Sequence, residues 1–206
     1  MITPKEEPLG KGFAATLAFL TACLLDQSVK LWVEEHGERF LAEKSEGFPH
    51  VFLIYTQNSG ALFGWLAGWP ESARLGVFGL AAGACLALAV LIYRSLARGE
   101  WLSAAALGLL VGGGLSNLMD RFRLGASVDL LRVPLPAYVV EPAPVFNLAD
   151  LFILAGACIL LLELLAGEAT ERASATRKSE PQGVPRPEEI GHRPEKTGDS
   201  KKNTAS

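Results

Sequence analysis

The sequence predicts an all-α integral membrane protein with four transmembrane helices. Half of its 206 residues are hydrophobic, and they gather in long blocks instead of being spread evenly. A membrane-spanning helix needs about 20 mostly apolar residues, and four blocks reach or approach this length. They lie at about residues 12–33, 73–93, 101–119 and 149–166.

The four blocks differ in the charges that they contain. The second carries one charge, at its start, and the third carries none. The first contains Asp26 and Lys30, and the fourth contains Glu163 near its end. Charged side chains inside a membrane are costly, so we expect these three to face the bundle interior or an interface. The glycines at 112–114 predict a close helix-packing surface in the third block.

The connection between the first two helices, about 34–72, is long enough for a small substructure. Its segment HVFLIYTQNSG (50–60) is rich in β-branched and aromatic residues and ends in a turn signal, which predicts a short strand. The following ALFGWLAGWP (61–70) carries two tryptophans and a phenylalanine. This composition predicts a segment that rests at the membrane–water interface.

Basic residues predict the orientation of the bundle. The short connection after the second helix contains Arg94 and Arg98, which predicts that it is cytoplasmic. With four helices, both termini are then cytoplasmic, so residues 1–11 form a cytoplasmic N-terminal segment. Basic residues before the first helix and after the fourth agree with this orientation, whereas three arginines beyond the third helix oppose it.

The two ends of the chain carry further signals. Residues 167–206 are rich in proline, serine, threonine and charge, which predicts a disordered cytoplasmic tail after a membrane domain at 12–166. Near the N-terminus, LTAC (20–23) imitates a processing site at which Cys23 would be modified. The apolar run continues past that cysteine to Leu25, which favours a retained helix.

Composition disfavours several classes of function. The net charge of −3 is too small to indicate a nucleic-acid-binding surface. The three cysteines stand singly in apolar runs, and the three histidines have no partner at metal-ligand spacing. We therefore expect neither a disulfide framework nor a metal or cofactor site. No GxSxG or Cys/His nucleophile signature is present in the sequence.

Polar residues from four parts of the chain are predicted to meet near the outer membrane surface. The third helix exits just before Asp120, the fourth starts beside Asp150, and about 20 Å of uncharged helix precedes Asp26. The residues that share this level are Asp26, Asn58, Asn117, Asp120, Arg121, Asp129, Asn147 and Asp150. Two carboxylates in one site can divide acid and base roles, because their like charges separate the two titrations.

Each of these residues also has a purely structural interpretation. Asp26 and Lys30 are one helical turn apart and could neutralise each other. Asp120 could pair with its arginine neighbour at the interface. Asn58 could be a turn residue, and Asp150 could stabilise its helix start through the backbone dipole. Their gathering at one level favours a functional site over these separate interpretations.

Four stretches of the sequence resemble the prolipoprotein signal peptidase family, also called signal peptidase II. They are LDQSVK (25–30), QNSGALFG (57–64), GGGLSNLMDRFRLGASVDLL (112–131) and VFNLADLFILAG (145–156), in the family's order. The resemblance covers about 12–166 and implies an intramembrane aspartyl protease. Such a protease cleaves lipoprotein precursors just before a lipid-modified cysteine. The external connection would then form the family's small β-rich cradle and interfacial helix.

The resemblance also implies roles for individual residues. Asp129 and Asp150 correspond to the catalytic pair, which would activate water without a metal or cofactor. The supporting polar residues would be Asp26, Lys30, Asn58, Gly60, Asn117, Asp120, Arg121 and Asn147. The implied partners are lipid-modified prolipoproteins and membrane phospholipid, not nucleic acid. We expect a monomer in the inner membrane of a bacterium, with its site near the outer face.

The sequence departs from the family pattern in three places. It has LSN (115–117) where the family often has a small residue and then glycine before the asparagine. It has SVDL (127–130) where the family often has Val-Val-Asp-Phe. The proline-containing stretch at 132–144 is longer than usual. These differences bear on substrate preference and loop geometry and leave both predicted catalytic carboxylates in place.

Two other functions remain as alternatives. A small proton-coupled transporter would carry acidic groups through the membrane thickness, whereas these cluster at one face. A non-catalytic membrane chaperone or lipid-binding protein would tolerate the loss of either Asp129 or Asp150. Single asparagine substitutions therefore separate this second alternative from the enzyme.

Overall fold

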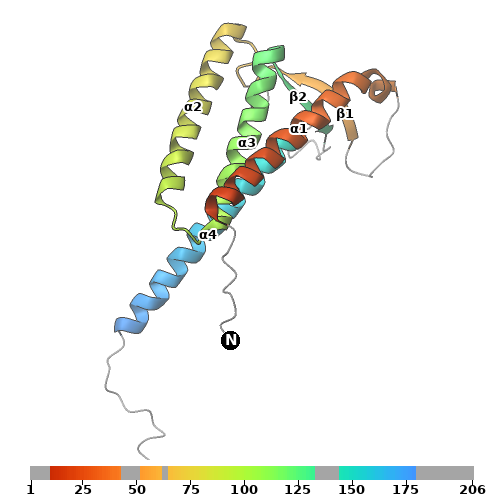
Figure 1. Ribbon diagram of the computed structural model, residues 1–206. Helices are drawn as coiled ribbons and strands as arrows, with labels where there is room; N and C mark the ends of the chain where they lie inside the picture. The colour runs from red at the N-terminus through yellow and green to blue at the C-terminus, as the bar shows by residue number, and fades with distance from the viewer. Residues whose placement is uncertain (1–9, 43–51, 62–64, 133–143, 180–206) are drawn as a thin grey trace, which may run out of the picture. The chain divides into compact units, whose positions relative to one another are not determined.

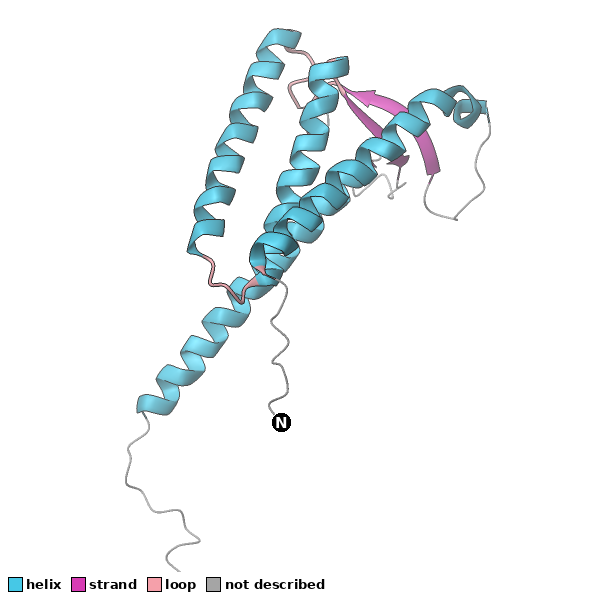
Figure 2. Cartoon of the chain, in the orientation of Figure 1, coloured by secondary structure: helices cyan, strands magenta, loops and turns pink. Residues whose placement is uncertain are grey.

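The described residues form four long helices and a small sheet (Figures 1 and 2). The computed structural model describes residues 10–42, 52–61, 65–132 and 144–179. Its elements are, in chain order, α1 (Lys11–Ala42), β1 (Phe52–Asn58), α2 (Glu71–Ser95), α3 (Trp101–Leu124), β2 (Ser127–Arg132), β3 (Val145–Phe146) and α4 (Leu148–Ser179). The chain divides into two compact units, Met1–Leu165 and Ala166–Ser206.

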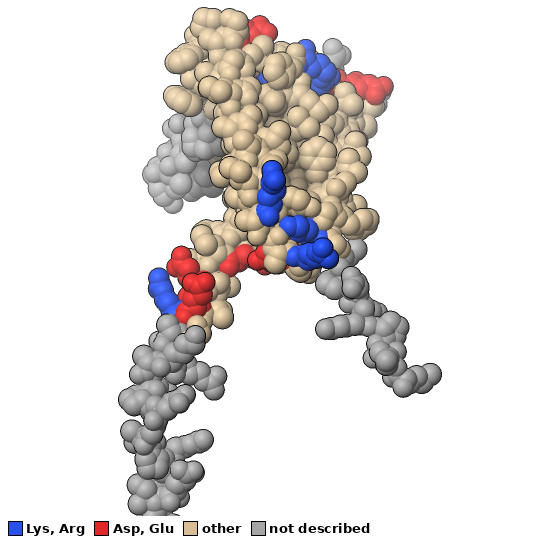
Figure 3. All heavy atoms as spheres, turned by 60° about the vertical axis from the view of Figure 1, so that its left-hand side comes forward, with Lys and Arg blue, Asp and Glu red and all other residues tan. Residues whose placement is uncertain are grey.

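All four helices are long and apolar enough to cross a membrane, which confirms the predicted fold class. The candidate spans are Lys11–Gly37, Glu71–Ser95, Trp101–Leu124 and Leu148–Ser174. α2 has no buried residue although it is strongly apolar, as expected of a helix surrounded by lipid. Figure 3 shows one face of the bundle, on which an uncharged band separates charged side chains at its two ends.

Glycines set the close approach of α3 to its neighbours. A Cβ atom on Gly108 or Gly112 would lie 2.3 or 2.5 Å from a backbone carbonyl oxygen of α1. On another side of α3, a Cβ on Gly113 would lie 2.7 Å from a carbonyl oxygen of α4, and one on Gly156 of α4 would lie 2.6 Å from a carbonyl oxygen of α3. The expected packing surface at 112–114 therefore exists for its first two glycines, whereas Gly114 has open space around it.

A three-stranded antiparallel sheet, in the order β1-β2-β3, lies beside the C-terminal parts of α1 and α3 (Figure 1). The strand expected within 50–60 is β1. Its pairing with β2 places Thr56 opposite Asp129 and Asn58 opposite Ser127. β2 also pairs with β3, which leads through a single residue into α4. The sheet therefore brings the first turn of α4 beside β2.

The connection between α1 and α2 differs from the prediction at two points. α1 continues to Ala42 instead of ending near residue 33. β1 packs against this helix, and a Cβ atom on Gly37 would lie 3.4 Å from the ring of Tyr55. The expected interfacial helix within 61–70 lies partly outside the described residues. Its described residues 65–68 form turns, in which Leu66 has a φ of 71°. A left-handed residue cannot continue an α-helix.

The last helix also extends beyond its predicted end near residue 166. α4 runs to Ser179, so the first part of the segment expected to be disordered is helical. The sequence of this extension is rich in alanine, glutamate, arginine and lysine, which are strong helix formers. Glu168 and Arg172, one turn apart, form an ion pair on its surface. The remainder of the predicted tail, 180–206, lies outside the described residues.

Candidate active site

Asp129 and Asp150 are both bound to one asparagine, Asn147. The Nδ2 atom of Asn147 donates to Oδ1 of Asp129 at 2.8 Å, and its backbone N–H donates to Oδ2 of Asp150 at 3.1 Å. The backbone N–H of Asp150 in turn donates to Oδ1 of Asn147 at 2.9 Å. Asn147 is therefore the N-cap of α4, and Asp150 returns the bond as in a capping box. Asp150 thus does have a structural use at its helix start.

The buried carboxyl of Asp129 is electrostatically unusual. Burial raises its pKa from the ordinary value of 3.8 to about 6, and repulsion from Asp150 adds to this rise. Hydrogen bonds from Asn58 and Asn147 and the charge of Lys30 lower the pKa and offset part of the effect. Asp129 can therefore hold a proton in a pH range where an ordinary aspartate is ionised.

Asn117, on α3, links this pair to the rest of the polar residues. Its Nδ2 donates to Oδ1 of Asp150 at 2.8 Å. Its Oδ1 accepts hydrogen bonds from Nζ of Lys30 at 2.7 Å, Oγ of Ser127 at 2.9 Å and Nδ2 of Asn147 at 2.9 Å. Three donors on one side fix the orientation of the amide, so its NH2 group faces Asp150.

A second pair of carboxylates shares one buried lysine. Nζ of Lys30 lies 2.6 Å from Oδ2 of Asp26 and 2.8 Å from Oδ2 of Asp120, and all three side chains are completely buried. Together with its bond to Asn117, these contacts use all three N–H groups of the ammonium. Asp26 and Lys30 therefore do neutralise each other, as the structural interpretation proposed. Buried charges of this kind are tolerated only when each is paired and hydrogen-bonded.

Arg121 binds two backbone carbonyls. Its Nη1 donates to the carbonyl of Asn117 at 3.0 Å, and its Nη2 donates to the carbonyl of Gly60 at 2.9 Å. The guanidinium lies 4.4 Å from the ring centroid of Phe78. It is close enough to the predicted catalytic pair to interact with both carboxylates electrostatically. Pairing of Arg121 with Asp120 was one structural interpretation of the sequence; the guanidinium instead bonds two backbone carbonyls and interacts electrostatically with Asp129, Asp150 and Asp120.

The loop after β1 carries two more predicted site residues. Oδ1 of Asn58 accepts a hydrogen bond from the backbone N–H of Gly60 at 3.0 Å, so Asn58 is a turn residue. The same side chain also hydrogen-bonds Asp129. Gly60 is buried, and its carbonyl is the acceptor for Arg121. This turn therefore connects the sheet with α3 beside the predicted catalytic pair.

Sequence reasoning missed three polar residues of the site: Gln27, Ser116 and Ser127. Nε2 of Gln27 lies 2.9 Å from both Oγ of Ser116 and Oδ1 of Asp120. Oγ of Ser116 donates to Oδ2 of Asp26 at 2.7 Å. Gln27 and Ser116 are adjacent in sequence to predicted site residues, and Ser127 lies two residues before Asp129. Their polarity within buried segments was the signal that could have identified them.

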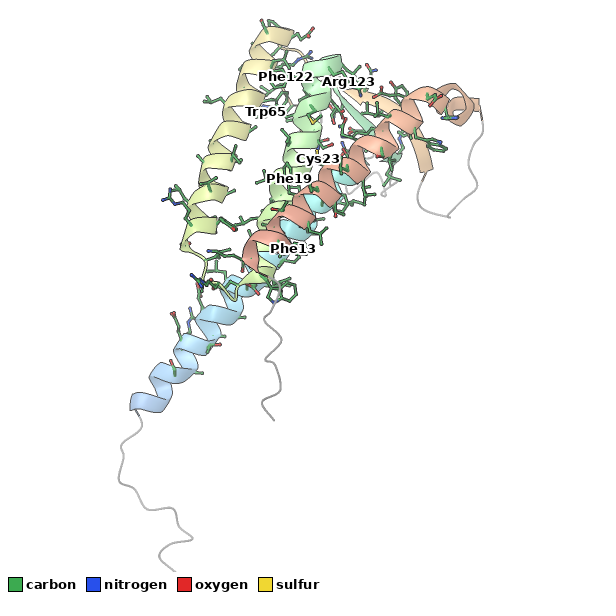
Figure 4. All side chains as sticks on the ribbon, viewed as in Figure 1. Phe13, Phe19, Cys23, Trp65, Phe122 and Arg123 are labelled. Carbon is green, nitrogen blue, oxygen red and sulfur yellow. The ribbon has the colours of Figure 1, made fainter. Side chains whose placement is uncertain are left out.

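The site lies at one end of the bundle. Asp120 belongs to the end of α3 at which Figure 4 shows Arg123, while Phe13 lies at the opposite end. Another carboxylate within a candidate span, Glu163, accepts a hydrogen bond from Ser103, which is about 25 Å along α3 from Asp120. Within the described parts of the chain, no group of three or more His, Cys, Asp or Glu side chains could hold a metal ion.

Comparison with known proteins establishes the family. A family model described as "Signal peptidase (SPase) II" matches residues 18–166. The chain belongs to the signal peptidase II family. Among curated proteins named lipoprotein signal peptidase, that of Rhodopseudomonas palustris is 34% identical over 161 residues, covering 76% of this chain and 94% of that protein. The protein of Nitrobacter hamburgensis is 37% identical, with 76% and 92% covered, and that of Yersinia enterocolitica is 35% identical, with 73% and 85% covered.

Solved structures show the same fold. One, described as a bacterial membrane enzyme at 2.3 Å resolution, has a TM-score of 0.62 at 22% identity and covers 82% of this chain and 94% of its own. Another, at 1.9 Å resolution, has a TM-score of 0.59 and covers 73% and 92%. Membership of the signal peptidase II family makes this chain a bacterial membrane protease of lipoprotein processing. The predicted family is therefore confirmed.

Proposed function

We propose that this signal peptidase II is an intramembrane aspartyl endopeptidase that cleaves lipid-modified prolipoproteins just before the diacylglyceryl-cysteine. Family membership supports the removal of signal peptides from prolipoproteins. The aspartyl mechanism rests on one observation, which is that Asn147 binds the carboxylates of both Asp129 and Asp150. The two groups thus share one small, largely buried site in which water can be activated between them.

The environments of the two aspartates support different roles. Asp129 has the raised pKa and is suited to carry the shared proton and to hydrogen-bond the scissile carbonyl oxygen. Asp150 accepts N–H bonds from Asn117 and Asn147 and is suited to take the proton from the attacking water. Asp129 would then protonate the leaving amine. The charge of Asp150 raises the pKa of Asp129, so protonation of Asp129 depends on its partner.

The remaining polar residues would support this chemistry without taking part in bond changes. Arg121 supplies a fixed positive charge that offsets the negative charge of the pair. Lys30 holds Asn117, which in turn donates to Asp150. The diacylglyceryl group of the substrate would remain in the bilayer and place the scissile bond at the level of the pair.

Cleavage of defined precursors tests this function. The purified protein is incubated with a lipidated prolipoprotein and with the same precursor lacking the lipid, and the products are identified by mass spectrometry. We expect cleavage before the modified cysteine in the lipidated precursor only, and no effect of chelators. Equal cleavage of the unmodified precursor, or chelator inhibition that added metal reverses, would contradict the proposal.

The dependence of kcat on pH provides a second readout of the same reaction. We expect a bell-shaped profile, because one carboxyl must be ionised and the other protonated. Its alkaline limb should lie at or above the pKa of about 6 of Asp129, since bound substrate excludes more water from this carboxyl. A kcat that rises steadily to pH 9 would argue against a shared proton.

A further inference from the structure

We propose that Ser116 is a positioning residue that acts through Asp26 on the first turn of α4 and thereby on Asp150. This inference rests on the proposed function, in which Asp150 activates water. Ser116 is completely buried on α3, directly before Asn117. The proposed mechanism assigns no role to its hydroxyl.

The hydroxyl of Ser116 has both of its hydrogen-bonding functions in use. Its Oγ donates to Oδ2 of Asp26 at 2.7 Å and accepts from Nε2 of Gln27 at 2.9 Å. Gln27 is in addition bound to Oδ1 of Asp120 at 2.9 Å. With one donor and one acceptor engaged, the hydroxyl is held in a single orientation toward Asp26.

Asp26 reaches from α1 to the beginning of α4. Its Oδ1 accepts the backbone N–H of Ala149 at 2.7 Å, and Ala149 directly precedes Asp150. The N–H groups in the first turn of a helix have no acceptor within the helix. Asp26 therefore supplies a tertiary cap beside the N-cap of Asn147. The position of this carboxylate sets the position of the backbone that carries Asp150.

Ser116 donates its single hydroxyl hydrogen to Asp26, on the oxygen that does not bind Ala149. Lys30 also contacts Oδ2 of Asp26, at 2.6 Å, but its ammonium is shared with Asp120 and Asn117. Without the hydroxyl, the carboxylate of Asp26 would follow the ammonium, and its bond to the first turn of α4 would lengthen. Asp129 would not move with it, because this residue belongs to the β2 strand.

Replacement of Ser116 by alanine tests the role of the hydroxyl. Ser103→Ala is the matched control, because Ser103 is also buried on α3 but its hydroxyl donates to Glu163 at the far end of the helix. We expect Ser116→Ala to lower kcat about five- to tenfold with an unchanged KM, since a displacement well below 1 Å costs less than the roughly hundredfold loss known for 1 Å. Ser103→Ala should stay within about twofold of the wild type.

The pH profile separates positioning from a general loss of folded protein. The charged groups that face Asp129 are Asp150 from α4, Lys30 from α1 and Arg121 from α3. If Asp150 moves away, its repulsion weakens, the pKa of Asp129 falls, and the alkaline limb shifts to lower pH. A merely structural role would lower the amount of active protein and leave this limb in place, which would overturn the inference.

A double-mutant cycle with Asp26→Asn tests the route of the effect. Lys30 and Asp120 remain a balanced pair in that background, so the variant is expected to insert. The effect of Ser116→Ala should be strongly reduced there, whereas additive effects would contradict action through Asp26. Should Ser116→Ala fail to insert, Ser116→Cys keeps a weak donor of similar size and should show a smaller loss of the same kind. If kcat is unchanged in both Ser116→Ala and Ser116→Cys, the inference is overturned.

The two proposals fail in different ways. If Asp129→Asn or Asp150→Asn retains cleavage, the proposed function is wrong whatever Ser116→Ala does. If both aspartate variants are inactive while Ser116→Ala keeps the wild-type kcat and pH profile, only the positioning role of Ser116 is wrong.

Discussion

At the scale of single residues, the polar groups of the site form two clusters with different electrostatics. In one, Asp26 and Asp120 share the buried ammonium of Lys30, and Arg123 lies 3.7 Å from Oδ1 of Asp120. In the other, Asp129 and Asp150 are bound to neutral asparagine donors, so neither is neutralised by a direct ion pair among the described residues. A proton can therefore be gained and lost in the second cluster without breaking a salt bridge.

The raised pKa of Asp129 predicts a pH-dependent cost to stability. Its carboxyl ionises at about 6 in the folded protein and near 3.8 when unfolded, so its contribution to stability falls as the pH rises through this range and is fully lost above it. Asp129→Asn should thus raise the melting temperature relative to the wild type at pH 7.5 but not at pH 4. Tryptophan fluorescence of the purified protein during heating measures this. An equal difference at both pH values would show that ionisation is not the cause.

The residues of the site could be predicted from the sequence better than their partners. Motif matches and membrane level identified Asn117, Asn147 and the four aspartates, and the structure brings them together. The position of a residue along a helix does not show which side of the helix it faces. The sequence therefore could not show that Lys30 pairs with Asp120, or that Arg121 interacts with Asp129 and Asp150. Ser116 was visible only as a departure from the family pattern.

At the scale of elements, hydropathy predicted the bounds of the two helices, α2 and α3, whose length matches their apolar block. The predicted 73–93 and 101–119 correspond to α2 (Glu71–Ser95) and α3 (Trp101–Leu124). α1 extends further because it packs against β1, and α4 extends further because strong helix formers follow its apolar run. β2 was not predicted, because its first four residues are all buried and show no alternation.

The contact between α1 and α3 should tolerate no added methyl group. In Gly112→Ala the new Cβ would meet the carbonyl oxygen of Phe19 at 2.5 Å, so α1, which carries Lys30, must shift. We expect a loss of about 1–3 kcal/mol in stability and reduced cleavage. Gly114→Ala is the control, since nothing lies within 4 Å of that position, and it should be neutral or slightly stabilising. Thermal unfolding that is equal in both variants would contradict this packing.

At the scale of the whole molecule, orientation in the membrane decides which compartment the site faces. The four candidate spans place the α2–α3 connection at the end of the bundle opposite to Asp120. The basic residues Arg94 and Arg98 flank that connection, and they favour its position in the cytoplasm. The pair of aspartates would then lie at the outer face, where the lipid-modified cysteine of an exported precursor would be located.

Reporter fusions test this orientation. A reporter joined near residue 97 should be active only in the cytoplasm, and one inserted near residue 45 only outside, because the basic connection resists translocation. A fusion within the α4 extension, after Ser174, provides an independent control and should report the cytoplasm. The opposite pattern of labelling would overturn the placement of the site at the outer face.

Cleavage of a lipidated precursor by aspartate variants tests the central claim most directly. Asp129→Asn and Asp150→Asn keep the shape of each side chain and remove one ionisable group, so each should reduce turnover at least about a thousandfold while precursor binding survives. The double variant should be hardly worse than either single one, and Glu168→Gln, at an exposed carboxyl of α4, should retain full activity. Substantial cleavage by either purified single variant would contradict a catalytic pair formed by Asp129 and Asp150.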